Sequence, residues 1–375
     1  MAGQKPRICY ILPRFDPATS SHFFHLYEMI NLASRSLDIR LILERSSRST
    51  LTLSVSGYRQ RFAFPPLRFL ELLFVLIGER LSGRRFFYTH YSFYGAFVSW
   101  LVTRLLGGTA YYWNCGMPWL YRRSFFEEAV FRFILRHTIL VTGTAGLAEE
   151  YARRYTLDSS HIRVMSNWID LSRFEDGRDR KHFRERLGVP VDAEMVLFVH
   201  RLSRRKGVHL LPEIMAEVTK RNRNVIFVIV GSGPEEESLR FKVKSLKLEP
   251  YVRLVGEVPH RGIPVYFHAA DIFLMPSEEE GFPHVLLEAQ ASGVPYVASD
   301  VGGVREITPP ELEPSVVAGG DVGGLTAKLS ELLFLSERER ARISAVGQEW
   351  VKQYDIKAVL PKFLELFQHW KLRFG

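Results

Sequence analysis

A short basic loop at residues 200–207, HRLSRRKG, carries two cations that could hold a pair of phosphate groups. Arg201 and Lys206 lie five residues apart, and Gly207 ends the turn. The planar guanidinium of an arginine and the compact ammonium of a lysine can converge on one diphosphate. The loop therefore indicates a diphosphate clamp, and the alternative interpretation is a solvated basic loop.

Two glutamates in the segment PSEEEGFPHVLLEAQASGVP, residues 276–295, could contact sugar hydroxyls. Pro283 can begin a helix and Gly293 can end it, which predicts a helix between them. Glu280 is then expected in the loop before the helix and Glu288 in its second turn. Because a carboxylate accepts hydrogen bonds from hydroxyl groups, both residues are candidate ligands of a sugar.

The start of that helix is a further candidate site for phosphate oxygens. The backbone N–H groups of a first helical turn have no partner within the helix, and the helix dipole favours an anion there. We therefore expect Gly281, Phe282 and Pro283 to lie against the ligand. Glu278 and Glu279, just before them, are expected to be solvated.

Two glycine-containing segments complete the set of loops with a chemical signature. Gly231 and Gly233 in GSGPEEESL, residues 231–239, would let the backbone approach a ligand closely. The glycine pair of SDVGGVREI, residues 299–307, would do the same. The alternative interpretation of each segment is a structural turn.

Each of these loops follows a short apolar run, and such runs alternate with helix-like stretches along the whole chain. This rhythm is typical of βαβ units around parallel sheets covered by helices on both faces. The sequence predicts an α/β fold with two doubly wound, Rossmann-like domains facing a cleft, with ligands bound by the loops after the strands. The predicted strands are 8–12, 39–43, 86–89, 110–114, 139–142 and 162–165 in the first half, and 196–199, 225–230, 252–255, 272–275, 295–298 and 316–318 in the second.

The length of 375 residues is enough for two domains. The charged stretch 173–186, RFEDGRDRKHFRER, contains no predicted strand and is the predicted boundary. We expect a first domain at residues 1–172 and a second at 173–350. Residues 351–375 are expected to form a C-terminal helix that packs back on the first domain.

The composition, with 46% apolar and 24% charged residues, is that of a folded globular protein rather than a disordered chain or coiled coil. Two cysteines, Cys9 and Cys115, are too few for a disulfide framework or a zinc ribbon. No run approaches the roughly 18–20 apolar residues that cross a bilayer. We therefore expect a cytoplasmic protein.

The net charge of +9 is concentrated in the first half of the chain. Residues 1–188 hold 27 Lys and Arg against 16 Asp and Glu, whereas residues 189–375 hold 23 against 25. A basic surface attracts nucleic acids, anionic membranes or phosphorylated acceptors, and no nucleic-acid-binding motif accompanies it here. The stretch 58–87 mixes arginines with apolar residues and could lie on the inner face of a membrane. The alternative is a core helix under a charged loop.

In this order and at these spacings, the segments 200–207, 231–239, 276–295 and 299–307 resemble the second domain of retaining glycosyltransferases of family 4. These proteins are also described as glycosyl transferases group 1 and have the two-domain glycosyltransferase-B fold. The resemblance is strong over residues 196–307 and weak before residue 140. It implies that the first domain takes the acceptor and that the second binds a nucleotide sugar.

The resemblance also implies a role for each matching residue. Glu280 corresponds to the glutamate that contacts the donor sugar, and Glu288 to the one that contacts the nucleotide ribose. Arg201 and Lys206 correspond to the residues that hold the diphosphate. We therefore expect Glu280, Arg201 and Lys206 to serve catalysis directly.

Several features depart from the family pattern. His200 stands where a glycine usually precedes the arginine, and Trp168 replaces a glycine in the domain-crossing segment SNWIDLSRF. The usual glycine pair after the first strand is replaced by PRFDPATSSH, residues 13–22, which contains Ser20 and Ser21. These two serines are candidate acceptor contacts.

The family often has a histidine at the end of the strand that matches residues 110–114, where this chain has Asn114 and Cys115. His90 follows another predicted strand and could also face the cleft. All three are candidate acceptor-side residues, and the alternative for His90 is a histidine of the core or the surface.

The resemblance implies transfer of a hexose from a nucleotide diphosphate sugar to a glycan or lipid-linked acceptor, as in polysaccharide biosynthesis, with the anomeric configuration retained. No cofactor is expected, and the absence of an Asp-x-Asp motif predicts independence from metal ions. Two alternatives remain: a nucleotide-sugar-binding protein without catalysis, and a phosphorylase or epimerase on the same architecture.

Overall fold

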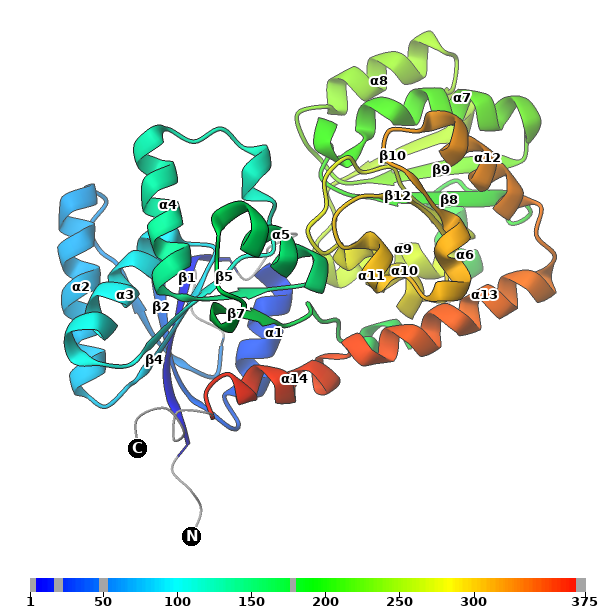
Figure 1. Cartoon of the computed structure of the whole chain (residues 1–375). Coiled ribbons are helices and arrows are strands. Elements are labelled where there is room, and N and C mark those ends of the chain that lie inside the picture. Colours follow the sequence, from blue (N-terminus) through cyan, green and yellow to red (C-terminus); the bar gives the residue numbers. More distant parts are fainter. Residues whose placement is uncertain (1–4, 17–22, 47–52, 176–179, 369–375) are drawn as a thin grey trace. The chain divides into compact units, whose positions relative to one another are not determined.

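The computed structural model describes residues 5–16, 23–46, 53–175 and 180–368, in two compact units (Figure 1). The first unit comprises residues 1–167 and 357–375, and the second comprises residues 168–356. Each unit is built on one parallel sheet with helices on both faces. The predicted α/β class, with two doubly wound sheets, is confirmed.

Within the described part of the first unit, seven parallel strands lie in the order β3-β2-β1-β4-β5-β6-β7. The direction in which the sheet grows reverses between β1 and β4, so their carboxyl ends form the switch point where such sheets bind ligands. The strands are β1 (Arg7–Phe15), β2 (Asp38–Ser46), β3 (Ser56–Arg59), β4 (Phe86–His90), β5 (Thr109–Trp113), β6 (Ile139–Thr142) and β7 (Ile162–Val164). The helices are α1 (Phe23–Ala33), α2 (Pro65–Leu81), α3 (Phe93–Leu106), α4 (Phe125–His137), α5 (Ala145–Tyr155) and α14 (Ile356–Glu365), the last of which begins in the second unit.

In the second unit, six parallel strands of the described chain lie in the order β10-β9-β8-β11-β12-β13, and the switch point is between β8 and β11. The strands are β8 (Glu194–Val199), β9 (Val225–Val230), β10 (Val252–Gly256), β11 (Ile272–Met275), β12 (Tyr296–Asp300) and β13 (Val316–Ala318). The helices are α6 (Arg180–Arg186), α7 (Leu211–Arg221), α8 (Glu236–Ser245), α9 (Ile263–Ala269), α10 (His284–Ala291), α11 (Val304–Ile307), α12 (Val322–Leu333) and α13 (Glu337–Trp350).

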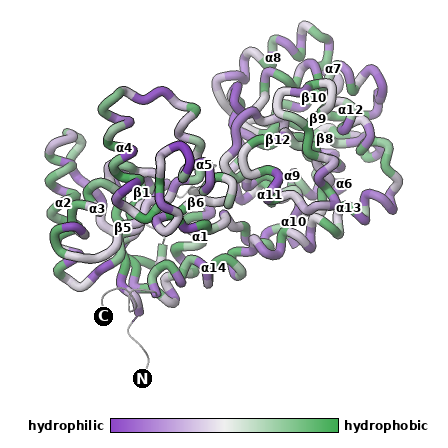
Figure 2. The backbone as a smooth tube through the Cα atoms, viewed as in Figure 1, coloured by the Kyte–Doolittle hydropathy of each residue, from purple (hydrophilic) through white to green (hydrophobic). Residues whose placement is uncertain are grey.

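Strand β8 shows why these strands are almost entirely apolar. Val196 and Phe198 belong to one buried cluster, whereas Met195, Leu197 and Val199 belong to the cluster on the other face of the sheet. Burial of each such side chain stabilises the fold by about 1.5–3 kcal/mol, so both faces favour the strand. In Figure 2, helices α7 and α8 alternate between hydrophobic and hydrophilic stretches, as helices with one buried face do.

Each of the twelve predicted strands overlaps a strand of the structure. The structure adds β3 at the edge of the first sheet, which the sequence did not predict. Its four residues, SGYR, are all partly or fully exposed, so they carry no apolar run.

The chain crosses between the units at residues 167–168 rather than at 172–173. The described part of the charged stretch 173–186 belongs to the second unit and includes α6. Arg184 is 3% exposed, donates to the carbonyls of Ala269 and Ala193 at 2.9 and 3.0 Å, and pairs with Asp271. The charged residues of this stretch are therefore not all solvated, because Arg184 anchors α6 through buried hydrogen bonds.

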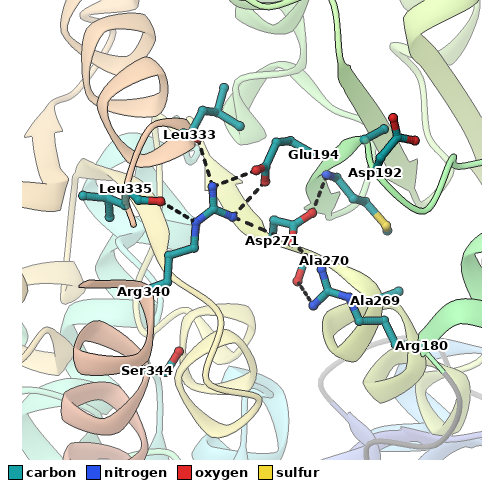
Figure 3. A network of polar contacts seen from close by, with 12 residues as sticks. Arg180, Asp192, Glu194, Ala269, Ala270, Asp271, Leu333, Leu335, Arg340 and Ser344 are labelled. Carbon is teal, nitrogen blue, oxygen red and sulfur yellow. Dashed lines mark hydrogen bonds and ion pairs between the residues drawn. The ribbon is translucent and has the colours of Figure 1, made fainter. Parts of the chain in front are cut away.

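Figure 3 shows the network to which Asp271 belongs. Arg340 of α13 donates to both carboxylate oxygens of Glu194, each at 2.8 Å, and lies 3.8 Å from Asp271. Glu194 begins β8 and Asp271 directly precedes β11, so the network ties together the amino-terminal edge of the second sheet. The loops with chemical signatures lie at the opposite, carboxyl edge.

The C-terminal residues from Lys357 onward belong to the first unit. Phe363 and Phe367 of this segment pack edge-on against Tyr88, with ring centroids 5.4 and 6.0 Å apart. Residues 351–354, which the sequence placed at the start of this segment, form a short 3₁₀ helix of the second unit.

Candidate active site

Lys206 and Glu280 meet at the switch point of the second sheet. Lys206 ends a 3₁₀ turn in the loop after β8, and Glu280 lies in the loop after β11. Lys206 Nζ donates a hydrogen bond to Glu280 Oε1 at 2.6 Å, and Ser277 Oγ donates to the same oxygen at 2.8 Å. The structure thus brings together Lys206, which is predicted to bind a diphosphate, and Glu280, which is predicted to bind a sugar.

The carboxylate of Glu280 is ionised although its side chain is only 6% exposed. Burial alone would raise the pKa of Glu280, but the charge of Lys206 holds it well below its ordinary value. His200 Nε2 lies 3.1 Å from Glu280 Oε1 without the alignment of a hydrogen bond. Burial, reinforced by Lys206, lowers the pKa of His200, so this imidazole is neutral at physiological pH.

One carboxylate oxygen of Glu280 keeps its capacity to bind a ligand. The contacts with Lys206, Ser277 and His200 all converge on Oε1. No hydrogen bond to Oε2 is present among the residues that the structure describes. Since an ionised carboxylate oxygen accepts two hydrogen bonds, Oε2 can receive a hydroxyl while Lys206 stays in place.

Glu288 is buried on α10 and is held by His260 and Arg173. His260 Nε2 lies 3.0 Å from Glu288 Oε1, and Arg173 donates to His260 Nδ1 at 3.0 Å and to the His260 carbonyl at 2.9 Å. Because a guanidinium can only donate, Nδ1 is the unprotonated nitrogen and Nε2 carries the proton that faces Glu288. Burial alone would raise the pKa of Glu288, but the hydrogen bond from His260 holds it below its ordinary value.

Gly302 and Gly207 allow the loops of the site to pack backbone against backbone. Gly302 has φ of 54°, and a Cβ there would lie 1.5 Å from the carbonyl oxygen of Glu280. Gly207 has φ of 71°, and its Cβ would lie 1.9 Å from the carbonyl oxygen of Pro276. A side chain at Gly207 would push apart the loops that carry Lys206 and Glu280, and one at Gly302 would push the loop after β12 away from Glu280.

Gly231 and Gly233 serve the same packing rather than forming an open ligand platform. A Cβ on Gly231 would lie 1.9 Å from the carbonyl of His200, and one on Gly233 would lie 2.3 Å from that of Leu202. The sequence attributed the close approach at these glycines to a ligand, and the structure attributes it to the loop after β8. A ligand contact by their backbone stays a prediction.

The start of α10 leaves backbone donors available. Pro283 is the N-cap, so the helix begins one residue later than predicted. Within the described part of the chain, the N–H groups of Gly281 and Phe282 donate no hydrogen bond. The Phe282 ring packs into the core against Tyr354, with centroids 5.8 Å apart, so a ligand would meet its backbone rather than its ring.

The second cation of the predicted clamp, Arg201, is exposed. Among the described residues it makes no hydrogen bond or ion pair through its side chain, so its five N–H donors remain for a ligand. Lys206 is only 14% exposed and is engaged with Glu280. The two cations therefore stand in different environments before any ligand binds.

The two glutamates before Glu280 are less freely solvated than predicted. The N–H groups of Glu278 and Glu279 both donate to the Arg205 carbonyl, at 2.9 and 3.1 Å. Glu278 Oε1 lies 3.3 Å from His209 Nε2, and Glu279 Oε1 lies 3.7 Å from Arg205. They hold the loop after β11 against the loop after β8.

His90, a predicted acceptor-side residue, is 1% exposed at the end of β4. Its ring stacks on Trp113 with centroids 5.2 Å apart, and its Nδ1 lies 3.3 Å from the Tyr10 hydroxyl. The structure therefore places it in the core of the first unit.

Asn114 and Cys115 also point into the first unit. Asn114 donates to the Tyr112 hydroxyl at 3.1 Å and accepts the Gly116 N–H at 2.8 Å, which fixes the turn after β5. Burial raises the pKa of the Cys115 thiol far above neutrality. Ser20 and Ser21 lie outside the described residues.

Sequence reasoning missed Ser277, His260 and Arg173. Ser277 lies in the loop after β11 and His260 in the loop after β10, so their positions after strands carried a signal. Arg173 begins the charged stretch that was interpreted as a boundary, and no local pattern relates it to His260, 87 residues later.

Residues 179–350 match the family model described as glycosyl transferases group 1. A D-inositol 3-phosphate glycosyltransferase of Kineococcus radiotolerans is 37% identical over 175 residues, covering 44% of this chain and 40% of the relative. D-inositol 3-phosphate glycosyltransferase 2 of Catenulispora acidiphila is 32% identical over 204 residues, covering 52% and 47%. The putative teichuronic acid biosynthesis glycosyltransferase TuaC of Bacillus subtilis is 36% identical over 162 residues, covering 43% and 38%. The chain thus matches about half the length of these curated relatives, or less.

Solved structures resemble the chain over nearly its whole length. Anabaena Alr3699/HepE in complex with UDP has a TM-score of 0.81 at 17% identity, covering 96% of this chain and 99% of that one. A glycosyltransferase from Rickettsia africae also has a TM-score of 0.81, at 16% identity, and covers 98% of each chain. At such identities the likeness establishes the fold, and the predicted glycosyltransferase-B architecture is confirmed.

Proposed function

We propose that the chain is a retaining glycosyltransferase, because residues 179–350 match the model of the glycosyl transferases group 1 family. It moves a hexose from a nucleoside diphosphate sugar to a glycan or lipid-linked acceptor. The observation that carries this proposal is the cluster of Lys206, Ser277 and Glu280 at the switch point of the second sheet. Such a cluster offers a fixed carboxylate for a sugar and a cation for a phosphate at one place.

The donor diphosphate lies between Lys206, Arg201 and the start of α10. The N–H groups of Gly281 and Phe282 add backbone donors on the positive side of the helix dipole. Negative charge develops on the leaving β-phosphate in the transition state, and fixed donors stabilise it. A hydrogen bond from a charged donor contributes about 1.5–3 kcal/mol, so the two cations stabilise the leaving phosphate more than the backbone N–H groups do.

The carboxylates orient the donor. Glu280 Oε2 accepts a hydroxyl of the transferred sugar, and Glu288 accepts a ribose hydroxyl. The acceptor oxygen bonds to the anomeric carbon as the bond from that carbon to the β-phosphate oxygen breaks, and the acceptor proton passes to the leaving phosphate. We expect no metal ion or cofactor in this step, since Lys206 and Arg201 supply the positive charge and the sequence has no Asp-x-Asp motif.

The relatives support a hydroxyl-rich acceptor. The name of one relative gives glycosyl transfer involving D-inositol 3-phosphate, and that of another gives a putative role in teichuronic acid biosynthesis. Both kinds of molecule combine hydroxyl groups with negative charge. A role in building a polysaccharide or a lipid-linked glycan in the cytoplasm follows from the same proposal.

The outer face of α2 supports peripheral membrane contact. Among the described residues, no helix combines the length and the apolar character of a membrane span. Helix α2 buries Leu72 and Leu76 against the sheet, yet large apolar side chains in and just before it are exposed. These exposed residues are Phe62, Phe64, Leu67, Leu70 and Phe74. The core interpretation therefore holds for one face of this stretch, and we propose that the other face enters a bilayer interface.

Fewer arginines serve this surface than the sequence suggested. Arg84 is 6% exposed and pairs with Asp38 and Glu79 at 3.0 and 3.2 Å. Arg80 donates to the Gly107 carbonyl at 2.6 Å. Each basic residue near an anionic surface contributes about 1 kcal/mol, so the apolar side chains must provide most of the binding.

A donor screen with a matched variant pair tests the proposal. UDP-, GDP- and ADP-sugars are screened for turnover, and binding of the free diphosphates is measured by calorimetry. Arg201→Ala should weaken diphosphate binding about tenfold or more, through loss of a charge-assisted hydrogen bond. Arg204→Ala, an exposed arginine of the same loop, is the control and should bind as the wild type does.

Two results would count against the proposed enzymatic activity. Unchanged diphosphate affinity in Arg201→Ala would show that Arg201 does not bind the diphosphate. Tight diphosphate binding with no turnover of any nucleotide sugar, in the presence of varied acceptors, would favour the binding protein without catalysis.

A further inference from the structure

A pocket of about 450 Å³ lies in the first unit, at the carboxyl ends of β1 and β2 and beside the segment that follows β4. This is the switch point of the first sheet, where doubly wound sheets bind ligands. The volume is within the range usual for small-molecule sites. The polar residues that line it include Arg14, Glu44, Arg45, Arg68, Ser92 and Tyr94.

The lining sets three arginines against one carboxylate. Glu44 is 7% exposed, and its nearest cation is Arg68, whose Nη2 lies 4.0 Å from Glu44 Oε2. Arg68 Nε is buried and has no hydrogen-bond partner within the described residues. Arg45 is exposed, and the same part of the chain gives its side chain no hydrogen bond or ion pair. An anion in the pocket would therefore meet positive charge that Glu44 does not neutralise.

Helix α3 adds backbone donors to the same pocket. Its N-cap, Ser92, accepts the N–H of Gly95 at 2.9 Å and donates to Glu44 Oε1. The N–H groups of Phe93 and Tyr94, which also line the pocket, make no hydrogen bond in the described structure. They lie at the positive end of a helix of 14 residues, where an anion is stabilised.

Glu44 favours a ligand that also carries a hydroxyl group. Among the described residues, Ser92 donates to Oε1, whereas the cation paired with Oε2 is Arg68, 4.0 Å away. Burial raises the pKa of Glu44 above its ordinary value, which reflects the weak compensation by Arg68. A ligand hydroxyl on Oε2 would restore the missing hydrogen bond, so the pocket suits a molecule with both an anionic group and a hydroxyl.

We propose that this pocket binds the acceptor through one anionic group, a phosphate monoester or a carboxylate, with a hydroxyl of the same molecule on Glu44. The identification of the ligand as the acceptor rests on the proposed glycosyltransferase function. The binding of a hydroxyl-rich anion rests on the pocket alone.

Calorimetry on the full chain tests the pocket without turnover. The probes are glucose 6-phosphate, glucuronate, uncharged glucose and inorganic phosphate, each titrated at low salt. We expect both sugar anions to bind at least tenfold more tightly than glucose, and tighter binding of one of them identifies the anionic group. Inorganic phosphate alone should bind more weakly than glucose 6-phosphate, because it cannot place a sugar hydroxyl on Glu44.

Matched arginine variants locate the binding. Arg45→Gln should weaken the binding of the sugar anions about tenfold, whereas Arg104→Gln, at the far end of α3, should leave it unchanged. Equal affinity for glucose and the sugar anions, absence of binding by both anions, or equal effects of the two variants would each overturn the proposal.

UDP titrated into the same samples separates the two proposals. UDP binding with no binding of the sugar anions overturns the pocket alone. Binding of both, with no transfer to any acceptor, overturns the enzyme while the pocket stands.

Discussion

Replacement of Lys206 by methionine should expose the energetic cost of the buried Glu280 carboxylate. Methionine keeps much of the length of lysine but removes the ammonium that lies 2.6 Å from Glu280 Oε1. Removal of one partner of a buried ion pair costs about 3–5 kcal/mol, because the other charge remains uncompensated. Ser277 still donates to the carboxylate at 2.8 Å, so we expect about 3 kcal/mol at neutral pH.

The pH dependence of this loss has a defined sign. In the wild type the pKa of Glu280 is lowered, so the stability that its ionised form contributes is present above the ordinary pKa of a glutamate, about 4.3, and is lost as the pH falls below it. In Lys206→Met the dominant effect is burial, which raises the pKa of Glu280. The variant carboxyl then takes up a proton as the pH falls, and the penalty shrinks. The stability difference between the two proteins should be larger at pH 7.5 than at pH 5.

The assay must follow the second unit by itself. Urea unfolding read out by hydrogen exchange of peptides from β8 and α10 meets this need. Lys206→Met, Glu280→Gln and the double variant form a cycle, and the double variant should lose at least 1 kcal/mol less than the sum of the single variants. Equal losses at the two pH values, or additive single variants, would refute the idea that this pair is an ionised, coupled unit.

Three further predictions address the site and the first unit. Glu280→Gln should lower kcat by at least about a hundredfold, because the side chain loses the charge that receives the donor sugar, and circular dichroism should show an intact fold. Wild-type turnover in this variant would exclude Glu280 from the catalytic site. Glu288→Gln should instead weaken nucleotide binding several-fold in calorimetry, and a change confined to kcat would contradict the ribose assignment. Serine at both Phe64 and Phe74 should reduce co-sedimentation with anionic vesicles at low salt, and equal, negligible binding by wild type and variant would rule out membrane docking.

The fold was predictable where burial acts on consecutive residues. Strands such as Val225–Val230 are buried along their whole length, and this gives a run that a sequence displays directly. The exposed edge strand β3 has no such run. The anchoring role of Arg184 was also hidden, because its acceptors at Ala269 and Asp271 are far along the chain and only the folded sheet brings them to it.

The site was predictable where one loop carries the whole signal. Arg201, Lys206 and Glu280 follow strands within segments of fixed spacing. The contact of His260 with Glu288 instead joins the segment after β10 to helix α10, 28 residues further along the chain. In the first unit, Glu44 and Arg45 directly follow the predicted strand 39–43 and could have been proposed by the rule used for the second unit. Glu44 and Arg45 belong to no recognised motif, so only their position after a predicted strand could have indicated them.

The two units use one local design with opposite electrostatic outcomes. At each switch point a buried glutamate accepts a hydrogen bond from a serine: Ser277, of the same loop, donates to Glu280, and Ser92, which follows β4, donates to Glu44. Lys206 touches Glu280 and lowers its pKa, whereas Arg68 lies 4.0 Å from Glu44 and burial prevails, so the pKa of Glu44 rises. Environments that push the pKa values of similar groups apart suit them to different roles. A Glu280 that is ionised at neutral pH suits a fixed contact to a sugar that must be positioned for transfer. The buried carboxylate of Glu44, which Arg68 compensates only weakly, suits a contact that is completed when a ligand arrives.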